Sequence, residues 1–201
     1  MSGKRLTPGK PVGDDGHRIV VWFSCGAASA AAAKLAVERG GNVHVVYCDT
    51  MASEHEDNRR FFADVQAWLG VEIQIIRSAK YKSVDDVIER RRYMAGVGGA
   101  TCTHELKRVP RELFERPSDL HVFGYTLEEV DRALRFEQQN PDLHVDWILI
   151  EQLVTKRECL NMLGAAGIAM PAMYGLGFEH NNCVGCVKST SPSYWNRTRD
   201  H

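Results

Sequence analysis

Residues 19–50, IVVWFSCGAASAAAAKLAVERGGNVHVVYCDT, decide the fold. They begin with a short β-branched run (residues 19–23), pass through a turn of small residues into an alanine-rich segment, and end in a second apolar run (residues 43–47). The middle segment favours helix, and Gly40 and Gly41 predict where that helix ends. Both runs are apolar on both faces, as in strands of a buried parallel sheet. Strand, helix and strand over about 30 residues predict a βαβ unit.

The alternation of strand and helix continues along the chain. Short apolar runs predict strands, and apolar residues three or four apart predict helices. The expected strands are residues 19–23, 43–47, 71–76, 120–123 and 145–150. The expected helices are residues 30–39, 56–69, 83–92, 102–114, 127–139 and 155–163. This order predicts an α/β fold, with an open, mainly parallel five-stranded sheet that carries helices on both faces.

Single residues mark the ends of some of these elements. Ser83 and Thr155 are expected to be N-caps, with Glu158 at the capping-box position. Pro110 is expected either to interrupt the helix over residues 102–114 or to separate two short helices. Two stretches are expected to be irregular, namely residues 94–100 (MAGVGGA) and residues 164–201, which hold CVGC.

Length and composition indicate one soluble globular domain over residues 18–201, preceded by a flexible arm over residues 1–17. The chain has 201 residues, of which 44% are hydrophobic. Its net charge of −1, from 25 basic and 26 acidic residues, argues against a strongly basic nucleic-acid binder. No apolar run suits a membrane helix or a signal peptide, so we expect a cytoplasmic protein without membrane contact. Disulfides are rare in the cytoplasm, so the six cysteines are expected to be metal ligands or reactive thiols.

The turn at residues 24–29 (SCGAAS) is the first candidate site. Its small residues let backbone N–H groups approach an anion at the positive end of the following helix. A tight turn without a ligand is the alternative, and Cys25 is either reactive or space-filling. Ligands of open α/β sheets bind beyond the carboxyl ends of the strands, so residues 48–50 and 124–126 are expected beside this turn.

Cysteines form the second candidate site. Cys183 and Cys186 form a CxxC pair in a polar segment, where one metal or cluster can take both thiolates. Cys102 is expected to converge with them, because the tail is free to fold back over the strand ends. Three unrelated core cysteines are the alternative. Cys48 and Cys159 are expected to be structural.

Basic residues gather near these features. An anionic substrate needs such groups to offset its charge, although any one of them could be a solvated surface charge. His104 could supply a fourth metal ligand. The basic residues are Lys107, Arg108, Arg132, Arg135, Lys188, Arg197 and Arg199.

Four segments resemble a known family. Residues 24–30 (SCGAASA) resemble the PP-loop of the adenine nucleotide alpha-hydrolase superfamily, and residues 47–62 (YCDTMASEHEDNRRFF) resemble its DTG-type segment. Residues 102–110 (CTHELKRVP) resemble the CC-x-x-R-K-x-x-P segment of the 3′-phosphoadenylyl sulfate (PAPS) and adenylyl sulfate (APS) reductases. The tail (residues 181–199) is similar to that of compact phage and prophage members. The resemblance covers residues 18–199.

The resemblance implies roles for particular residues. The turn would bind the phosphates or sulfate of an adenine nucleotide (PAPS, APS or ATP), and the segment after the second strand would lie near the adenosine. The residues implied to bind the nucleotide are Ser24, Gly26, Ala27, Ser29, Asp49, Thr50 and Gly124, with Arg132 and Lys188 as charge partners. The residues implied to hold a [4Fe–4S] cluster, with zinc as the alternative, are Cys102, Cys183 and Cys186. The residues expected in catalysis are Cys25, unless a partner supplies the thiol, and Lys107.

Three departures from the family pattern bear on mechanism. Ala28 stands where the ATP-cleaving relatives have Asp, and Thr103 stands where the fourth cluster cysteine would be. No cysteine follows Cys186 to match the C-terminal nucleophile of the reductases. Three thiolates on a [4Fe–4S] cluster would leave one iron open, as in iron–sulfur tRNA thiolation enzymes.

These features predict a PAPS/APS reductase-like enzyme of sulfur metabolism that acts on a sulfonucleotide with a cysteine-bound cluster. One alternative is an adenylating sulfurtransferase that modifies a nucleic acid or a small molecule through the three-cysteine cluster. The other is a non-catalytic nucleotide sensor with structural zinc. An electron or sulfur donor, such as a thiol protein, is the expected partner. A nucleic-acid substrate and a homodimer stay open.

Overall fold

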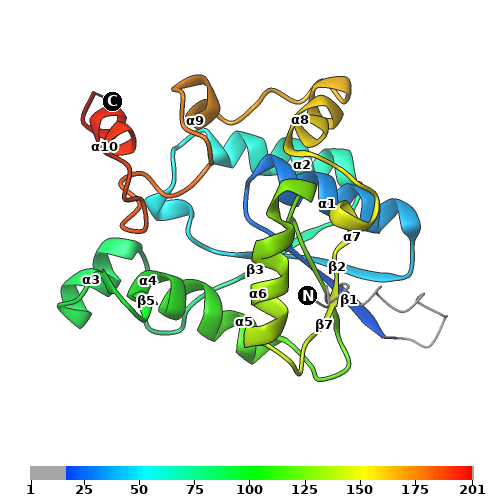
Figure 1. Ribbon diagram of the computed structural model, residues 1–201, viewed down its shortest axis with the longest axis horizontal. Helices are drawn as coiled ribbons and strands as arrows, with labels where there is room; N and C mark the ends of the chain where they lie inside the picture. Colours follow the sequence, from blue (N-terminus) through cyan, green and yellow to red (C-terminus); the bar gives the residue numbers. More distant parts are fainter. Residues whose placement is uncertain (1–16, 201) are drawn as a thin grey trace, which may run out of the picture.

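Five strands form one sheet in which every pairing is parallel, as the sequence predicts. The computed structural model describes residues 17–200 (Figure 1). Along the sheet the strand order is β3-β2-β1-β6-β7. The strands are β1 (Arg18–Phe23), β2 (Asn42–Cys48), β3 (Ile73–Ile76), β6 (Leu120–Phe123) and β7 (His144–Asp146).

Helices cover both faces of the sheet (Figure 1). The main helices are α1 (Ala27–Arg39), α2 (Asn58–Leu69), α5 (Val109–Phe114), α6 (Val130–Gln139) and α8 (Lys156–Ala165). On one face, Val21 packs in a core with residues of α1, α2 and α8. On the other face, Trp22 packs with Phe114 of α5 and Phe123 of β6. Phe136 of α6 contacts Phe123 with ring centroids 4.8 Å apart, so α6 also lies on this second face.

Alanine dominates α1 because several elements pack around this helix. The four alanines at positions 30–33 are 0% exposed, and Ala36 is 1% exposed. α1 contacts β1, β2 and β6 of the sheet and also α2 and α8. A helix that is buried on most sides is apolar all round, and small side chains let its neighbours approach closely.

The chain changes direction across the sheet between β1 and β6. From β1 it builds β2 and β3 on one side, and it then crosses to β6 and β7 on the other side. In open α/β sheets, a crevice for a ligand lies at such a switch point, beyond the carboxyl ends of the strands. Ser24 follows β1 and Gly124 follows β6, so both residues lie at this point.

The fifth strand is shorter than the sequence predicts. The apolar run at residues 145–150 predicts a strand, but β7 ends at Asp146, and Ile148–Glu151 form a helix, α7. Ile148 and Leu149 are 0% exposed and pack in the core beside α1. Short apolar runs look alike in buried strands and buried helices, which is why the periodicity misassigned this one.

The tail is more regular than the sequence predicts. α8 ends at Ala165, and two further helices follow, α9 (Ala172–Gly175) and α10 (Pro192–Asp200). Pro192 begins α10, at a position where its missing N–H costs no helical hydrogen bond. The CVGC segment lies between α9 and α10 in a stretch without regular secondary structure.

Pro110 does not interrupt the helical segment that carries it. α4 (Thr101–Thr103), a π-helical turn η2 (His104–Arg108) and α5 follow one another directly. The wider π turn lies just before Pro110, which has no N–H to donate to the helix. The glycine-rich break before α4 forms a small antiparallel hairpin of β4 (Ala95–Gly96) and β5 (Gly99–Ala100).

Both predicted N-caps are confirmed. The Oγ of Ser83 accepts a hydrogen bond from the backbone N–H of Asp86 at 3.1 Å, at the start of α3 (Val84–Arg91). The hydroxyl of Thr155 caps α8, and Oε2 of Glu158 accepts from the backbone N–H of Thr155 at 2.7 Å. Two short 3-10 turns are η1 (Met51–Ser53) and η3 (Leu127–Glu129).

The arm predicted for residues 1–17 lies outside the described residues, apart from His17. Between residues 17 and 200, no helix has the length and apolar character needed to span a membrane.

Candidate functional site

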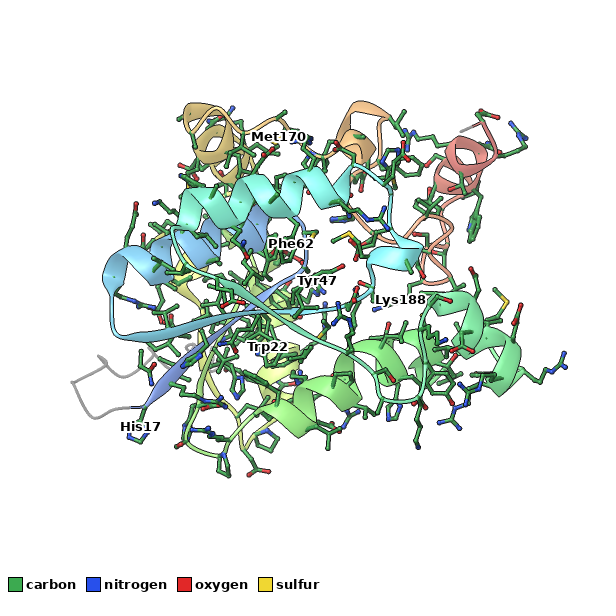
Figure 2. The ribbon with its side chains drawn as sticks, turned by 180° about the vertical axis from the view of Figure 1, so that it is seen from behind. His17, Trp22, Tyr47, Phe62, Met170 and Lys188 are labelled. Carbon is green, nitrogen blue, oxygen red and sulfur yellow. The ribbon has the colours of Figure 1, made fainter. Side chains whose placement is uncertain are left out.

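A cleft of about 960 Å³ opens at the carboxyl edge of the sheet, where the sequence predicts a ligand. Residues from β1, β2, β6, α5, α6 and the tail line it. Figure 2 shows Lys188 at this end of the sheet, between the tail and the helical segment that contains α5. The predicted nucleotide-binding residues that line the cleft are Ser24, Gly26, Ala27, Ser29, Thr50, Gly124, Arg132 and Lys188.

The turn at residues 24–29 is held from within by one hydroxyl. Oγ of Ser29 accepts hydrogen bonds from the backbone N–H of Ser24 (3.1 Å) and of Gly26 (3.3 Å), and it donates to the carbonyl of Gly26 (2.9 Å). Ser24 is exposed and lines the cleft, and its own hydroxyl donates to Oγ of Ser29 at 3.1 Å. The first N–H groups of α1 have no intrahelical acceptor, which makes this end of the helix a place for an anion.

Gly124 lets the end of β6 touch the first turn of α1. A Cβ at this position would lie 2.5 Å from the backbone N and 2.6 Å from the Cα of Ser29. No side chain fits there without moving the helix. The sequence predicts Gly124 near the nucleotide, and the structure gives it a second task, which is to set the distance between β6 and the turn.

Six basic side chains line the cleft, and four of them have internal partners. Arg108, Arg111 and Arg132 form ion pairs with glutamates on their own helical segments, and Lys156 donates to the carbonyl of Glu179. In residues 17–200, Lys107 and Lys188 form no ion pair with a carboxylate. The cleft therefore offers two uncompensated ammonium groups to an anionic ligand.

Cys25 is not accessible from the cleft. Its side chain is 0% exposed, and burial raises the pKa of its thiol far above the usual range. Its carbonyl accepts a hydrogen bond from Nδ2 of Asn181 at 2.6 Å, which ties the turn to the tail. In this arrangement the thiol predicted to be the nucleophile stays protonated and away from any bound substrate.

Cys48, which the sequence analysis treats as structural, does line the cleft. Burial raises the pKa of its thiol to about 11, against the opposing effect of the positive charges of Lys107 and Arg111. Its Sγ lies 3.6 Å from the carbonyl of Lys107. Cys159, in contrast, is a residue of α8 that is 0% exposed and packs in the core.

The three cysteines predicted to hold a cluster influence one another electrostatically. Burial raises the pKa of Cys183 to about 11, while the ammonium of Lys107 lowers it and the charges of Cys186 and Cys102 raise it further. Such mutual influence indicates that the thiols and Lys107 lie in the same region of the molecule. All three cysteines are partly buried, and none of them lines the cleft itself.

Tyr194 of α10 holds the CVGC segment in place. Its hydroxyl accepts from the backbone N–H of Cys186 at 2.7 Å and donates to the carbonyl of Cys183 at 3.2 Å. The backbone N–H of Val184 also donates to the carbonyl of Ser53 in η1 at 3.0 Å. The tail is therefore fixed beside the end of β2. The sequence analysis expected this, because an irregular tail can fold back over the ends of the strands.

The side chains present show whether this region could coordinate a metal ion. In residues 17–200, no group of three or more His, Cys, Asp or Glu side chains is arranged to hold a metal ion. His104 is exposed, with Nδ1 3.5 Å from Glu105, so it does not join the thiols. A structural zinc site needs such a closed set of ligands. The same finding covers the three thiols, which in residues 17–200 are not arranged as a metal-binding group.

Asp49 lies outside the cleft lining. Its Oδ2 pairs with Nε of Arg77 at 2.7 Å, and its Oδ1 accepts from the backbone N–H of Met51 at 3.1 Å. Thr50 lines the cleft but is 3% exposed, and its hydroxyl donates to Oε1 of Glu54 at 2.5 Å. Both residues predicted near the adenosine are therefore occupied with internal contacts.

Sequence reasoning missed several residues that line the cleft. Arg111 could have been found, because it lies four residues after Lys107 on the same helical segment and so on the same side. The tail residues carry no comparable signal, because their place depends on how the tail folds back. The missed residues include Trp22, Arg111, Phe123, Phe136, Lys156, Tyr174 and Asn181.

No protein-family model matches the chain, and neither does any curated protein. Function must then be inferred from the cleft itself. Its main features are the turn at the start of α1 and two lysines that form no ion pair within residues 17–200, while the three thiols lie outside its lining.

Proposed function

We propose that the protein is an adenine-nucleotide-binding enzyme of sulfur metabolism, similar to the PAPS and APS reductases of the PP-loop superfamily. One observation carries the proposal. Lys107 lines the same cleft as the turn at residues 24–29, and its charge also acts on Cys183. A nucleotide anion and a cysteine centre would thus share one lysine.

The phosphate or sulfate end of the nucleotide would bind at the turn. The first N–H groups of α1 and the hydroxyl of Ser24 would donate to its oxygens, and Lys107 and Lys188 would offset its charge. The turn lies at the switch point of the sheet, which supports this placement.

The three cysteine thiolates would hold a [4Fe–4S] cluster at the Lys107 end of the cleft. Such a cluster, when bound, supplies electron transfer or a site for sulfur. Burial raises the pKa of Cys183 to about 11 and the ammonium of Lys107 opposes this rise, so metal binding would have to displace the thiol proton.

The position of Cys25 bears on the choice of reaction. Reduction of a sulfonucleotide in this class needs a nucleophilic thiolate, and Cys25 is 0% exposed. The thiol would therefore come from a donor protein or a small thiol. The same observation favours the second candidate, an adenylating sulfurtransferase, because that reaction needs no cysteine nucleophile from the turn.

Ligand binding and turnover test the proposal. Calorimetry with APS, PAPS and ATP should show binding that Gly26→Leu weakens at least tenfold, or about 1.4 kcal/mol, since the side chain would fill the approach to the turn. Gly164→Ala, in open space on α8, is the matched control. Sulfite release with a thiol donor would identify a reductase, and AMP with pyrophosphate from ATP would identify a sulfurtransferase. Absence of binding by all three nucleotides would overturn the proposal.

A further inference from the structure

One buried amide lies between the turn at residues 24–29 and the CVGC segment. Asn181 is 7% exposed, and its Nδ2 donates to the carbonyl of Cys25 at 2.6 Å and to Oδ1 of Asn58 at 2.8 Å. Cys183 follows two residues later in the chain. The side chain of Asn181 therefore connects the candidate anion site to the segment that carries the cysteines.

A chain of hydrogen bonds fixes which way this amide points. Oε1 of Glu54 accepts from the hydroxyls of Tyr47 (3.0 Å) and Thr50 (2.5 Å), and its Oε2 accepts from Nδ2 of Asn58 (2.6 Å). An ionised carboxylate only accepts, so Asn58 turns its Nδ2 to Glu54 and its Oδ1 to Asn181. Asn181 can meet that oxygen only with its own Nδ2.

This orientation leaves the oxygen of the Asn181 amide without a donor. Within residues 17–200, Oδ1 of Asn181 is buried and has no hydrogen-bond partner. Nearly all buried polar groups are paired, because an unpaired one destabilises the folded state. The contact is thus favourable through the amide nitrogen and unfavourable through the oxygen. Its net stabilisation is reduced, so a ligand at the turn can change how firmly the tail is held.

The backbone of Cys25 depends on the hydrogen bond from Asn181. Cys25 has a φ of +54°, in the left-handed region that residues with a side chain rarely adopt. Its carbonyl shares a peptide plane with the N–H of Gly26, so the same hydrogen bond sets the direction of that N–H. A second tail residue supports the turn, since the hydroxyl of Tyr174 accepts from the N–H of Ala27 at 3.4 Å.

We infer that Asn181 is a positioning residue that couples the turn to the CVGC segment. The inference rests on the proposed function and adds a link between its two halves. An anion at the turn stabilises the conformation of Cys25 that accepts from Asn181, and the tail is then held more firmly. The hydrogen bond from the N–H of Val184 to the carbonyl of Ser53 therefore opens less often. Coupling of this kind is reciprocal, so a firmly held tail strengthens anion binding by the same factor.

Hydrogen–deuterium exchange on the full chain tests the coupling, with pyrophosphate as the anion. The peptide over residues 181–190 reports on the tail, because the N–H groups of Val184 and Cys186 are hydrogen-bonded there. Saturating pyrophosphate should slow exchange in this peptide about fivefold or more, which is the lower end of coupling between sites in proteins. The concentration that saturates each variant comes from calorimetry.

Asn181→Leu is the decisive variant, because leucine has nearly the same shape and no charge but cannot donate to Cys25 or Asn58. In this variant the slowing by pyrophosphate should fall below about twofold. Asn196→Leu, the same change at an exposed position of α10, should respond as the wild-type protein does. An asparagine that served stability alone would lower Tm when replaced and leave the response of the tail to pyrophosphate intact.

The outcomes separate this inference from the proposed function. If pyrophosphate binds but does not slow exchange at residues 181–190, the coupling is wrong, while anion binding at the turn stands. If Asn181→Leu keeps the wild-type slowing, the coupling does not run through Asn181, and the inference is wrong. If Asn181→Leu does not fold, Asn181→Ala decides in the same way. If pyrophosphate does not bind the wild-type protein, the anion site of the proposed function fails, and this inference fails with it.

Discussion

Gly124→Ala tests how the turn at residues 24–29 is held in place. The added Cβ would lie 2.5 Å from the backbone N of Ser29, 2.6 Å from its Cα and 2.8 Å from the carbonyl carbon of Ala28. All three atoms belong to the backbone at the start of α1, so no side-chain rotation relieves the overlap. Either β6 or the first turn of α1 must move by most of an ångström to restore ordinary contact.

The expected cost follows from the packing around α1. The helix is enclosed by the sheet, α2 and α8, so it cannot retreat freely, and overpacking of this kind costs about 1–3 kcal/mol. For a chain of this size, 1 kcal/mol corresponds to roughly 2–4 °C in Tm, so Tm should fall by roughly 2–12 °C. Anion binding should weaken as well, because the same movement displaces the N–H groups of the turn.

Thermal unfolding and pyrophosphate calorimetry measure the two effects. Gly26→Ala is the matched control, since its Cβ would meet Oγ of Ser24 at 3.8 Å and its backbone φ is −105°. That variant should keep the wild-type Tm. If Gly124→Ala is as stable as Gly26→Ala and binds pyrophosphate as tightly as the wild-type protein, then β6 does not position the turn, and the argument is wrong.

Three further predictions follow from the cysteines and from buried titratable groups. Serine at each of the three predicted cluster cysteines should abolish iron content and visible absorbance in anaerobically purified protein, whereas Cys159→Ser should change neither. Burial lowers the pKa of His121 to about 4. The stability that its neutral form contributes is therefore fully present above pH 6.5 and is lost as the pH falls toward 4. At about 1.36 kcal/mol per pKa unit, the loss in free energy of unfolding is about 3 kcal/mol. Urea unfolding between pH 7 and 4 should show this loss, His121→Gln should flatten it, and His144→Gln, an exposed control, should not. Lys107→Gln should raise the pKa of Cys48 and slow its alkylation at pH 9, and an unchanged rate would show that the lysine charge does not reach the thiol.

The sheet could be predicted because its strands carry a strong local signal. The run at residues 19–23 is β-branched, is apolar on both faces and ends at a turn of small residues, and buried parallel strands have this composition. The error at residues 145–150 has the same origin, since burial makes a short helix as apolar as a strand. Ile148 could pair with a neighbouring strand or pack on α1, and tertiary contacts decide between the two. The four residues of α7 do not encode those contacts.

The turn could be predicted because its residue types are tied to a particular backbone geometry. Small residues between a strand and a helix indicate close backbone approach, and Gly124 proves to be such a residue on the opposite side of the contact. Tyr194 and Asn181 could not be predicted in the same way. They hold the tail against η1 and the turn through contacts across as many as 156 residues of sequence, and nothing local marks a tyrosine or an asparagine for that task.

The contrast between Cys25 and Cys48 shows where the sequence stops being informative. Tyr47 and Cys48 are consecutive residues of β2, so they must face opposite sides of the sheet. Alternation alone does not say which side stays open. That depends on α1, which fills the first side with alanine at close range, and on α5 and α6, which leave a groove on the second. Cys25, at the start of the filled side, is sealed in the core, and Cys48 reaches the cleft. A cysteine at a strand end therefore becomes accessible or inert according to helix packing elsewhere in the chain.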